Sequence, residues 1–340
     1  MPAMSLIFVS CSKYHWWKTT FLLPWAALIF AAGFAMREWG AYEYDNLNVF
    51  ISSIVLILAA PPLYAAAEYV ILGRLLYYVP WLSPIHPGRV ITTFLGLGAV
   101  TEALTANGAA IFANRSNSLS KIKLGSDLIK AALILQALIE VGFLALVAVF
   151  YSRCKNASVS NAKMRKVVYL LFGTSLLILA RCIFRVVEVF ESQPGEEPGA
   201  ITKNEWPFWV FETGLMIICT YWLNWHHPAQ YLPKNFKLYL SSIDKTTEIE
   251  GPGWVDKRPL IVTLFDPFDL VGLAMRSDEK NRFWENETVG PDGVPVVAPT
   301  THPEPTESVG MTATNQTPQP GQSQYGFEPR PNNSSPEKMV

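Results

Sequence analysis

Three charged residues, Arg181, Arg185 and Glu188, interrupt the apolar stretch LLILARCIFRVVEVFE at residues 176–191. Their spacing is i, i+4 and i+7, so a helix would gather them on one narrow face, opposite leucine, isoleucine, valine and phenylalanine. This face could be structural, with Glu188 neutralising Arg185 and Arg181 pairing with a carboxylate of another helix. It could also bind a lipid headgroup, because the planar guanidinium group matches phosphate and carboxylate. The sequence leaves both roles open, and they are compatible.

Further carboxyl groups lie in three other apolar stretches. Glu212, in EWPFWVFETGLMIICTYWLNWHHP, is the expected partner of Arg181 or Arg185, whereas Glu68 and Glu102 lie in AAPPLYAAAEYVILGR and VTEALTANGAA. Because charged groups inside membrane spans usually face the bundle interior or a wet cavity, we expect one shared polar seam. The predicted substrate-binding residues of this polar seam are Glu68, Glu102, Arg181, Arg185, Glu188 and Glu212.

Pro61 and Pro62 lie in the middle of the same stretch as Glu68. They remove two backbone donors and are expected to kink or break a helix there. Glu68 follows one to two turns later, among alanines that allow helices to approach closely. Two interpretations remain open: a kinked packing helix, or a hinge at Pro61 and Pro62 beside a carboxyl group that takes up a proton or an amine.

Catalytic and metal-binding patterns are weak in this sequence. His226 and His227 are adjacent, so on a helix their side chains would point about 100° apart, which makes joint metal ligation awkward. We find no convincing Ser-His-Asp set, phosphate-binding loop or dinucleotide-binding fingerprint. We therefore expect no catalytic residue, no metal and no cofactor, and the protein is not expected to be an enzyme. An intramembrane lipid hydrolase is the least favoured alternative.

The elements that must position these residues are apolar helices. Half of the 340 residues are hydrophobic and only 16% are charged, which indicates a membrane protein, and a net charge of −1 gives no reason to expect nucleic acid as a partner. Runs of about 20 apolar residues between short polar loops predict an all-α, polytopic transmembrane helix bundle. Six spans are predicted, at roughly 19–37, 47–72, 90–112, 127–151, 167–190 and 206–225.

Charge and composition also predict orientation and domain organisation. One set of loops carries more than twice as many Lys and Arg residues as the other, which places both ends of a six-span bundle in the cytoplasm. The tail after about residue 276 is rich in Pro, Gly, Ser, Thr, Asn and Gln and is expected to be disordered. The predicted parts are a short N-terminal segment at 1–18, the helix bundle at 19–226, a cytoplasmic juxtamembrane segment at 227–275 and the disordered cytoplasmic tail at 276–340.

Several motifs together resemble the fungal lipid-translocating exporter family, the RTA-like membrane proteins associated with aminocholesterol resistance. The resemblance covers residues 15–235 and includes the R-x-x-x-R-x-x-E element described above. The matching motifs are REWGAY (37–42), APPLYAAAEYVILGR (60–74), SPIHPGR (83–89), LILQ (133–136), RCIFRVVE (181–188), EWPFWVFE (205–212) and HHPAQYLP (226–233).

The resemblance implies a seven-helix protein with its C-terminus in the cytoplasm, located in the plasma membrane. It implies an exporter of lipids or amphiphiles, such as sphingoid bases, phospholipids or sterol analogues, that contributes to stress or drug resistance. Its partners would then be membrane lipids or amphiphilic small molecules. The alternative from a different class is a seven-helix receptor or sensor. By this resemblance, Gly98 and Thr105 stand where many members carry Asp and Gln, and we expect the first family helix to be missing.

Overall fold

The structure is a computed structural model of the whole chain. It describes residues 21–43, 46–85, 87–113, 118–159, 161–192, 199–251, 283–289 and 295–297. The predicted N-terminal segment, most of the predicted tail and residues 252–275 of the juxtamembrane segment lie outside the described residues.

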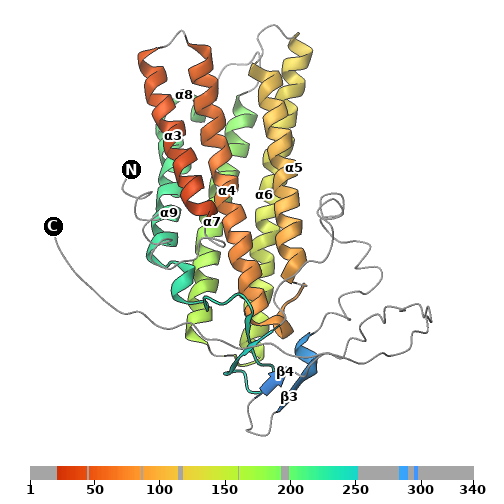
Figure 1. Cartoon of the computed structure of the whole chain (residues 1–340). Coiled ribbons are helices and arrows are strands. Elements are labelled where there is room, and N and C mark those ends of the chain that lie inside the picture. The colour runs from red at the N-terminus through yellow and green to blue at the C-terminus, as the bar shows by residue number, and fades with distance from the viewer. Residues whose placement is uncertain are drawn as a thin grey trace, which may run out of the picture. The chain divides into compact units, whose positions relative to one another are not determined.

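Helices form nearly all of the described structure, which confirms the all-α bundle (Figure 1). The α-helices are α3 (Leu22–Tyr42), α4 (Leu47–Tyr78), α5 (Pro87–Ala113), α6 (Leu119–Asn156), α7 (Ala162–Glu191), α8 (Ala200–Lys203) and α9 (Leu215–Trp225). A π-helix, Phe208–Gly214, directly precedes α9. Short 3₁₀-helices lie at Pro80–Leu82, between α4 and α5, and after α9 at Pro228–Gln230 and Phe283–Asn286. Consecutive long helices are antiparallel neighbours: α3 packs on α4, α4 on α5, α5 on α6, α6 on α7 and α7 on α9.

Asparagine side chains cap the N-termini of two long helices, α4 and α7. The Asn46 carboxamide accepts a hydrogen bond from the backbone N–H of Val49, and that of Asn161 accepts one from Lys163. Such caps satisfy backbone donors that the first turn of a helix leaves unpaired. They fix where α4 and α7 begin, and these two helices carry most of the buried polar groups described below.

Only four of the described helices are long and apolar enough to span a membrane: α4, α5, α6 and α7. The prediction of six spans is therefore too high by this measure. Arg37 and Glu38 lower the hydropathy of α3 near its C-terminal end. The last predicted span is helical, but it is divided into the π-helix and an α-helix of 11 residues.

The two prolines do not interrupt their helix. α4 continues for 32 residues through Pro61 and Pro62, so the predicted break does not occur. Proline removes the N–H that would bond the carbonyl one turn earlier, but the flanking turns can hold the helix together when neighbouring helices pack around it. Pro61 is buried in this packing, while Pro62 is partly exposed. Their role as a hinge remains a prediction.

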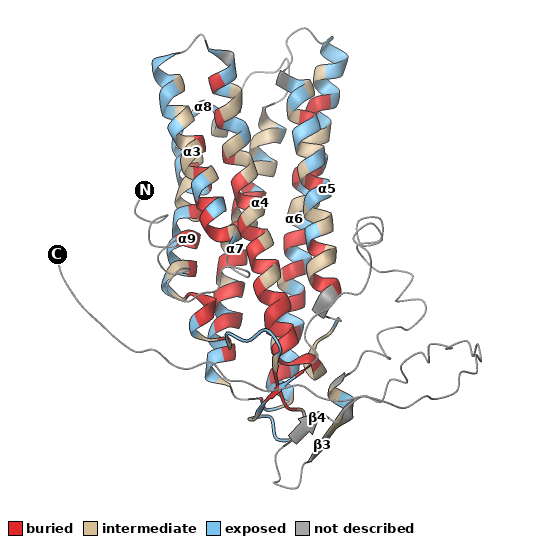
Figure 2. Cartoon of the chain, viewed as in Figure 1, coloured by how far each residue is buried: buried red, intermediate tan, exposed pale blue. Residues whose placement is uncertain are grey.

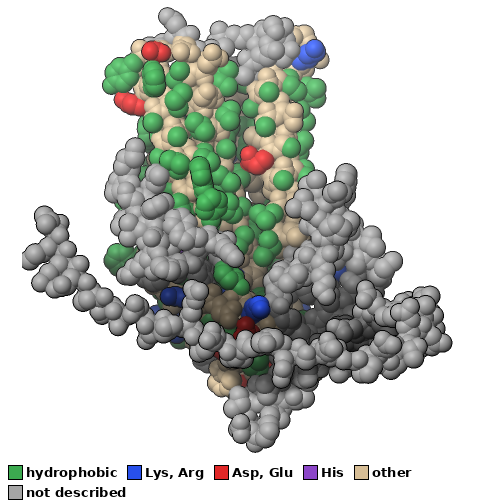
Figure 3. Space-filling model, in the orientation of Figure 1, with side chains coloured by type: hydrophobic (Ala, Val, Ile, Leu, Met, Phe, Trp, Pro, Cys, Tyr) green, Lys and Arg blue, Asp and Glu red, His purple; other side chains and the backbone are tan. Residues whose placement is uncertain are grey.

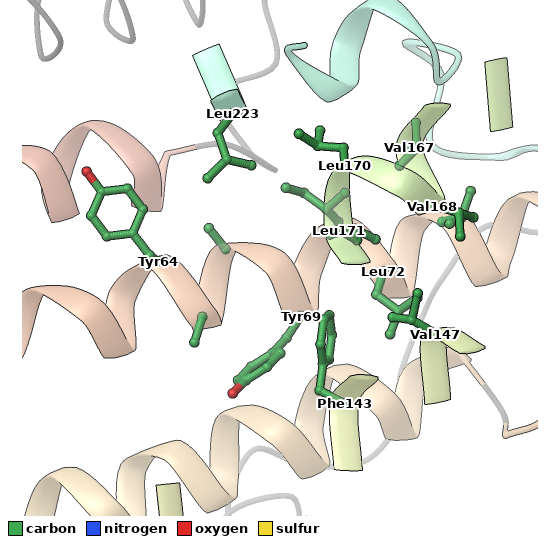
Figure 4. Packing of buried hydrophobic residues seen from close by; sticks show 14 of the residues in the cluster. Tyr64, Tyr69, Leu72, Phe143, Val147, Val167, Val168, Leu170, Leu171 and Leu223 are labelled. Atoms are coloured by element: carbon green, nitrogen blue, oxygen red, sulfur yellow. The ribbon is translucent and has the colours of Figure 1, made fainter. Parts of the chain in front are cut away.

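The hydrophobic core lies between α4, α6, α7 and α9 (Figure 4). Tyr69 of α4 packs against Phe143 of α6 with ring centroids 5.0 Å apart, and Leu171 of α7 and Leu223 of α9 belong to the same cluster. Figure 2 shows buried residues along α4 and toward the end of the bundle where α4 finishes. Between the ends of the helices, the visible outer face carries mostly hydrophobic side chains (Figure 3). That distribution suits a bundle surrounded by lipid.

Residues 233–251, here called the C-terminal segment, pack against the end of α4. The segment contains strands β1 (Leu238–Leu240) and β2 (Glu248–Glu250), which pair antiparallel with Tyr239 opposite Ile249. A second hairpin, β3 (Glu287–Val289) and β4 (Pro295–Val297), falls within the stretch predicted to be disordered. Glu287 accepts hydrogen bonds from the hydroxyls of Ser241 and Ser242, which ties this hairpin to the C-terminal segment.

Candidate functional site

Four of the six predicted seam residues meet in one network, here called the arginine–glutamate cluster: Arg181, Arg185, Glu188 and Glu212. Arg181 donates from Nε and Nη2 to the two carboxylate oxygens of Glu212, both at 2.8 Å. Arg185 donates from Nε to Glu212 at 2.7 Å and from Nη1 to Glu188 at 2.7 Å. The structural role anticipated for this face is therefore present, with Glu212 shared between both arginines.

Burial is graded across the arginine–glutamate cluster. The side chains of Arg181 and Glu212 are 1% and 0% exposed, whereas those of Arg185 and Glu188 are 12% and 20% exposed. Two arginines and two glutamates balance in formal charge, which is the arrangement that allows ions to remain charged inside a bundle. The cluster thus has a closed side at Arg181 and an accessible side at Arg185 and Glu188.

The π-helix positions Glu212. Phe208 and Glu212 both lie in this seven-residue segment, and both contact Arg185: Phe208 through its ring, 5.4 Å from the guanidinium carbon, and Glu212 through its carboxylate. A π-helix has more residues per turn than an α-helix and so rotates the side chains that follow it. π-helical turns are often found at functional sites. The hydropathy of the sequence does not indicate that this segment forms a π-helix.

A line of stacked groups leads from the cluster to the end of the bundle. The Arg37 guanidinium lies 4.5 Å from the ring centre of Phe208, on which Arg185 also stacks. Arg37 also forms an ion pair with the exposed Glu205 at 3.9 Å. Cation–π contacts of this kind strengthen when they are shielded from water. The accessible side of the arginine–glutamate cluster is thus connected to charged groups at the bundle end.

Glu102 and Glu68 are not bonded to the arginine–glutamate cluster. Glu102, on α5, is partly exposed and close enough to Arg181 to act on it electrostatically, but no described residue hydrogen-bonds its side chain. Glu68 is fully buried and accepts a hydrogen bond from the hydroxyl of Ser175 instead. The predicted seam is therefore divided into two polar groups along α7.

Residues that the sequence analysis did not place in the seam complete the second group. Glu140 of α6 is 1% exposed and accepts a hydrogen bond from the Tyr69 hydroxyl at 3.4 Å. Glu68 and Glu140 are close enough to interact electrostatically. In the sequence, Glu140 could be recognised as a carboxyl group inside the fourth apolar stretch. Ser175 could be recognised by its position six residues before Arg181, and it lies on the buried face of α7.

The two adjacent histidines, His226 and His227, follow α9 and form hydrogen bonds with different groups. The Nδ1 of His226 lies 2.8 Å from the hydroxyl of Tyr231, and the Nδ1 of His227 accepts a hydrogen bond from the N–H of Ala229. Burial lowers the pKa of His227 to about 4, because the imidazolium form loses its hydration there. No group of three or more His, Cys, Asp or Glu residues suited to hold a metal ion occurs within the described part of the chain.

Comparison with known proteins assigns the chain to a family. The family model described as RTA1-like protein matches residues 25–235, which contain both polar groups. The chain belongs to the RTA1-like family. A relative from Leptosphaeria maculans, named lipid-translocating exporter-like protein RTA1, is 34% identical over 287 residues, covering 79% of this chain and 55% of the relative. This family is named for exporter-like membrane proteins and not for an enzyme.

Two further relatives of this RTA1-like chain differ in coverage. A protein of the same name from Ajellomyces capsulatus is 29% identical over 284 residues, covering 80% of this chain and 87% of the relative. Protoporphyrin uptake protein 1 of Saccharomyces cerevisiae is 31% identical over 195 residues, covering 55% of this chain and 61% of the relative. By contrast, the match to the Leptosphaeria maculans relative spans only about half the length of that protein. No solved structure matches.

The family and the long apolar helices confirm a multi-pass integral membrane protein of the RTA1-like type. The motifs that carried the resemblance are distributed over the matched residues, and RCIFRVVE and EWPFWVFE contain the whole arginine–glutamate cluster. The assignment of individual residues to substrate binding remains a prediction.

Proposed function

We propose that this protein translocates lipids or amphiphilic small molecules, and that the arginine–glutamate cluster binds the polar headgroup. The observation that carries the proposal is the state of Arg185. Its Nε and Nη1 are bonded to Glu212 and Glu188, while its Nη2 has no acceptor among the described residues. A guanidinium group with an unused donor on its accessible edge is suited to a phosphate or carboxylate ligand.

Glu188 and Glu102 would set the charge that the site accepts. Glu188 is the most exposed member of the cluster, and Glu102 is close enough to Arg181 for an electrostatic interaction, with no hydrogen-bonding partner among the described side chains. A zwitterionic or amine-bearing headgroup could place its cation against these carboxylates and its anion against Arg185. The site thereby favours headgroups that carry a positive charge alone or beside a negative one.

An apolar groove offers a surface for the hydrocarbon part of such a molecule. It has a volume of about 520 Å³ and runs between α5 and α6. Phe94, Leu97, Leu138 and Val149 are among the side chains that line it. Because the outer face of the bundle is hydrophobic, acyl chains can stay in lipid while the headgroup is sheltered between helices.

The cellular setting is part of the same proposal. The excess of Lys and Arg in one set of loops supports a cytoplasmic C-terminus. We further propose that the protein is located in the plasma membrane and contributes to stress or drug resistance, as the family resemblance implies. No specific feature of the described residues favours the receptor or the hydrolase alternative.

Flux in reconstituted vesicles tests the proposal. Purified protein in phospholipid vesicles is expected to move a fluorescent phospholipid or a fluorescent long-chain amine between leaflets faster than protein-free vesicles do. Arg185→Lys is expected to lower this rate several-fold, because lysine keeps the charge but loses the planar fork. Arg153→Lys is the matched control, because Arg153 is exposed and, among the described residues, bonds only the carbonyl of Ser83. Rates equal to protein-free vesicles for every amphiphile would remove the transport proposal.

A further inference from the structure

A pair of carboxyl groups lies in the core of the bundle without a counter-ion. Glu68 of α4 and Glu140 of α6, here called the carboxyl pair, are 0% and 1% exposed. Their hydrogen-bond donors are neutral: the hydroxyl of Ser175 for Glu68 and the hydroxyl of Tyr69 for Glu140. The two carboxyl groups come from different helices and interact across the core.

Each member of the carboxyl pair also has one oxygen without a partner. Oε1 of Glu68 and Oε1 of Glu140 are buried, and no described residue donates a hydrogen bond to either. An ionised carboxylate requires donors or a cation at both oxygens when it leaves water. Each unpartnered oxygen is therefore an atom to which a proton can bind.

The other titratable groups around the carboxyl pair cannot neutralise it. Tyr69 on α4, Cys182 on α7 and Cys219 on α9 each lie close to one or both carboxyl groups, and none of these side chains can carry a positive charge. Arg181, which adjoins Cys182 on α7, is bonded in a bidentate manner to Glu212. No Lys or Arg side chain among the described residues forms an ion pair with the carboxyl pair.

We propose that Glu68 and Glu140 form a proton-binding site in which at least one of the two carboxyl groups is protonated at neutral pH. Two carboxylates that share a buried site cannot both ionise, because like charges repel and neither is solvated. A protonated carboxyl group is neutral, so it needs no counter-ion in the core, and it can donate a hydrogen bond. The bound proton is exchangeable, since ionisable residues inside membrane bundles commonly form proton relays.

Proton binding at the carboxyl pair is placed to influence the arginine–glutamate cluster. Ser175, which bonds Glu68, precedes Arg181 by six residues, or about 9 Å along the axis of α7. Cys182 lies close to Glu140 on one side and to Arg181 and Glu212 on the other. Loading or losing a proton changes the charge felt by this helix face. If the proposed translocation is correct, the proton is a candidate coupling ion.

Infrared spectroscopy of the membrane-reconstituted protein detects the bound proton directly. Wild-type protein at pH 7.5 is expected to show the C=O stretch of a protonated carboxyl group. This band should decrease in the double variant Glu68→Gln/Glu140→Gln and remain unchanged in Glu205→Gln, whose side chain is 77% exposed. Equal bands in the wild type and in the folded double variant would overturn the proposal.

A second variant keeps the test decisive if the double variant does not fold. Tyr69→Phe removes the hydroxyl that donates to Glu140, and a Phe side chain occupies nearly the same volume. The carboxyl band is expected to shift in frequency because its hydrogen bonding changes. A band that neither shifts nor changes in amplitude would show that it does not come from the carboxyl pair.

Flux measurements separate this inference from the proposed function on which the coupling rests. Wild-type flux is expected to depend on a pH gradient across the vesicle, and flux in Glu68→Gln/Glu140→Gln is expected to lose that dependence. Wild-type vesicles without any flux would contradict the proposed function but leave the infrared result standing. Gradient-dependent flux that persists in the double variant would overturn coupling through this pair.

Discussion

At the scale of single residues, Arg185 has both a structural contact in the charged face and a proposed role in binding a headgroup. It bonds Glu212 and Glu188 and stacks on Phe208, yet it keeps one unused nitrogen on the accessible side. Arg181, one turn earlier, has its bidentate contact with Glu212 fully enclosed. Residues of the same type on the same helix face therefore differ in availability because burial differs between them.

Replacing Arg185 should reveal its structural contribution. Arg185→Ala leaves Glu188 without its bonded cation and Glu212 with only Arg181, so we expect a loss of about 3 kcal/mol in stability. Arg185→Lys keeps the charge and should retain more folded protein. The yield of monodisperse protein in detergent measures both effects. Equal yields for the two variants would indicate that the charge at this position is dispensable.

His227 should make stability depend on pH in the acidic range. Its folded pKa of about 4 lies below the value of about 6.5 for an unperturbed histidine, so the unfolded state binds more protons between these values. The unfolding free energy should therefore fall as pH decreases from about 6.5 to about 4, by roughly 2–3 kcal/mol. Thermal unfolding of wild-type protein and of His227→Gln measures this contribution, with His226→Gln as the neighbouring control. An identical pH profile for His227→Gln would contradict it.

At the scale of elements, close approach of helices determines which polar groups meet. Gly108 of α5 and Gly125 of α6 face each other at a contact where an added Cβ on either would lie about 2.9 Å from the carbonyl oxygen of the other. Small residues at such crossings let helix backbones pack tightly in membranes. The α5–α6 crossing helps to hold α5, and with it Glu102, beside the rest of the bundle.

Substitution at this crossing can be compared with a matched site on the same helix. Gly125→Ala should lower stability by about 1–3 kcal/mol, because the new methyl group meets backbone atoms that cannot move independently. Gly142→Ala, also on α6, has nothing within 4 Å of the added Cβ and should be neutral or slightly stabilising. Midpoints of thermal unfolding in detergent provide the measurement. A Gly125→Ala midpoint at or above that of Gly142→Ala would refute the close packing.

At the scale of the whole molecule, Arg74 connects the first half of the bundle to the C-terminal segment. Its guanidinium donates to the carbonyls of Asn235 at 2.7 Å, Phe236 at 3.1 Å and Leu238 at 3.3 Å. The hydroxyl of Tyr78 adds a hydrogen bond to Glu248 at 2.8 Å. Contacts between residues about 160 positions apart thus hold the end of α4 against residues 233–251.

Loss of this connection should release the C-terminal segment without unfolding the bundle. In Arg74→Lys, one ammonium group replaces a planar fork that serves several carbonyls, so the segment should lose protection. Hydrogen exchange of residues 233–251 is expected to rise several-fold, while exchange in α6 and α7 stays unchanged. Arg153→Lys is the control at the same end of the bundle. Unaltered protection of residues 233–251 in Arg74→Lys would show that other contacts hold the segment.

The sequence by itself determined the helical membrane architecture, the family and the shared helix face of Arg181, Arg185 and Glu188. Apolar length and i, i+4, i+7 spacing are local properties, so they can be read along one chain. Tertiary structure decided that Glu212 is shared by both arginines, that Glu68 lies near Glu140 and bonds Ser175, that α4 passes through Pro61 and Pro62 unbroken, and that a π-helix presents Glu212. These outcomes depend on which helices pack together and at what rotation, and buried polar groups respond to the partners that packing supplies.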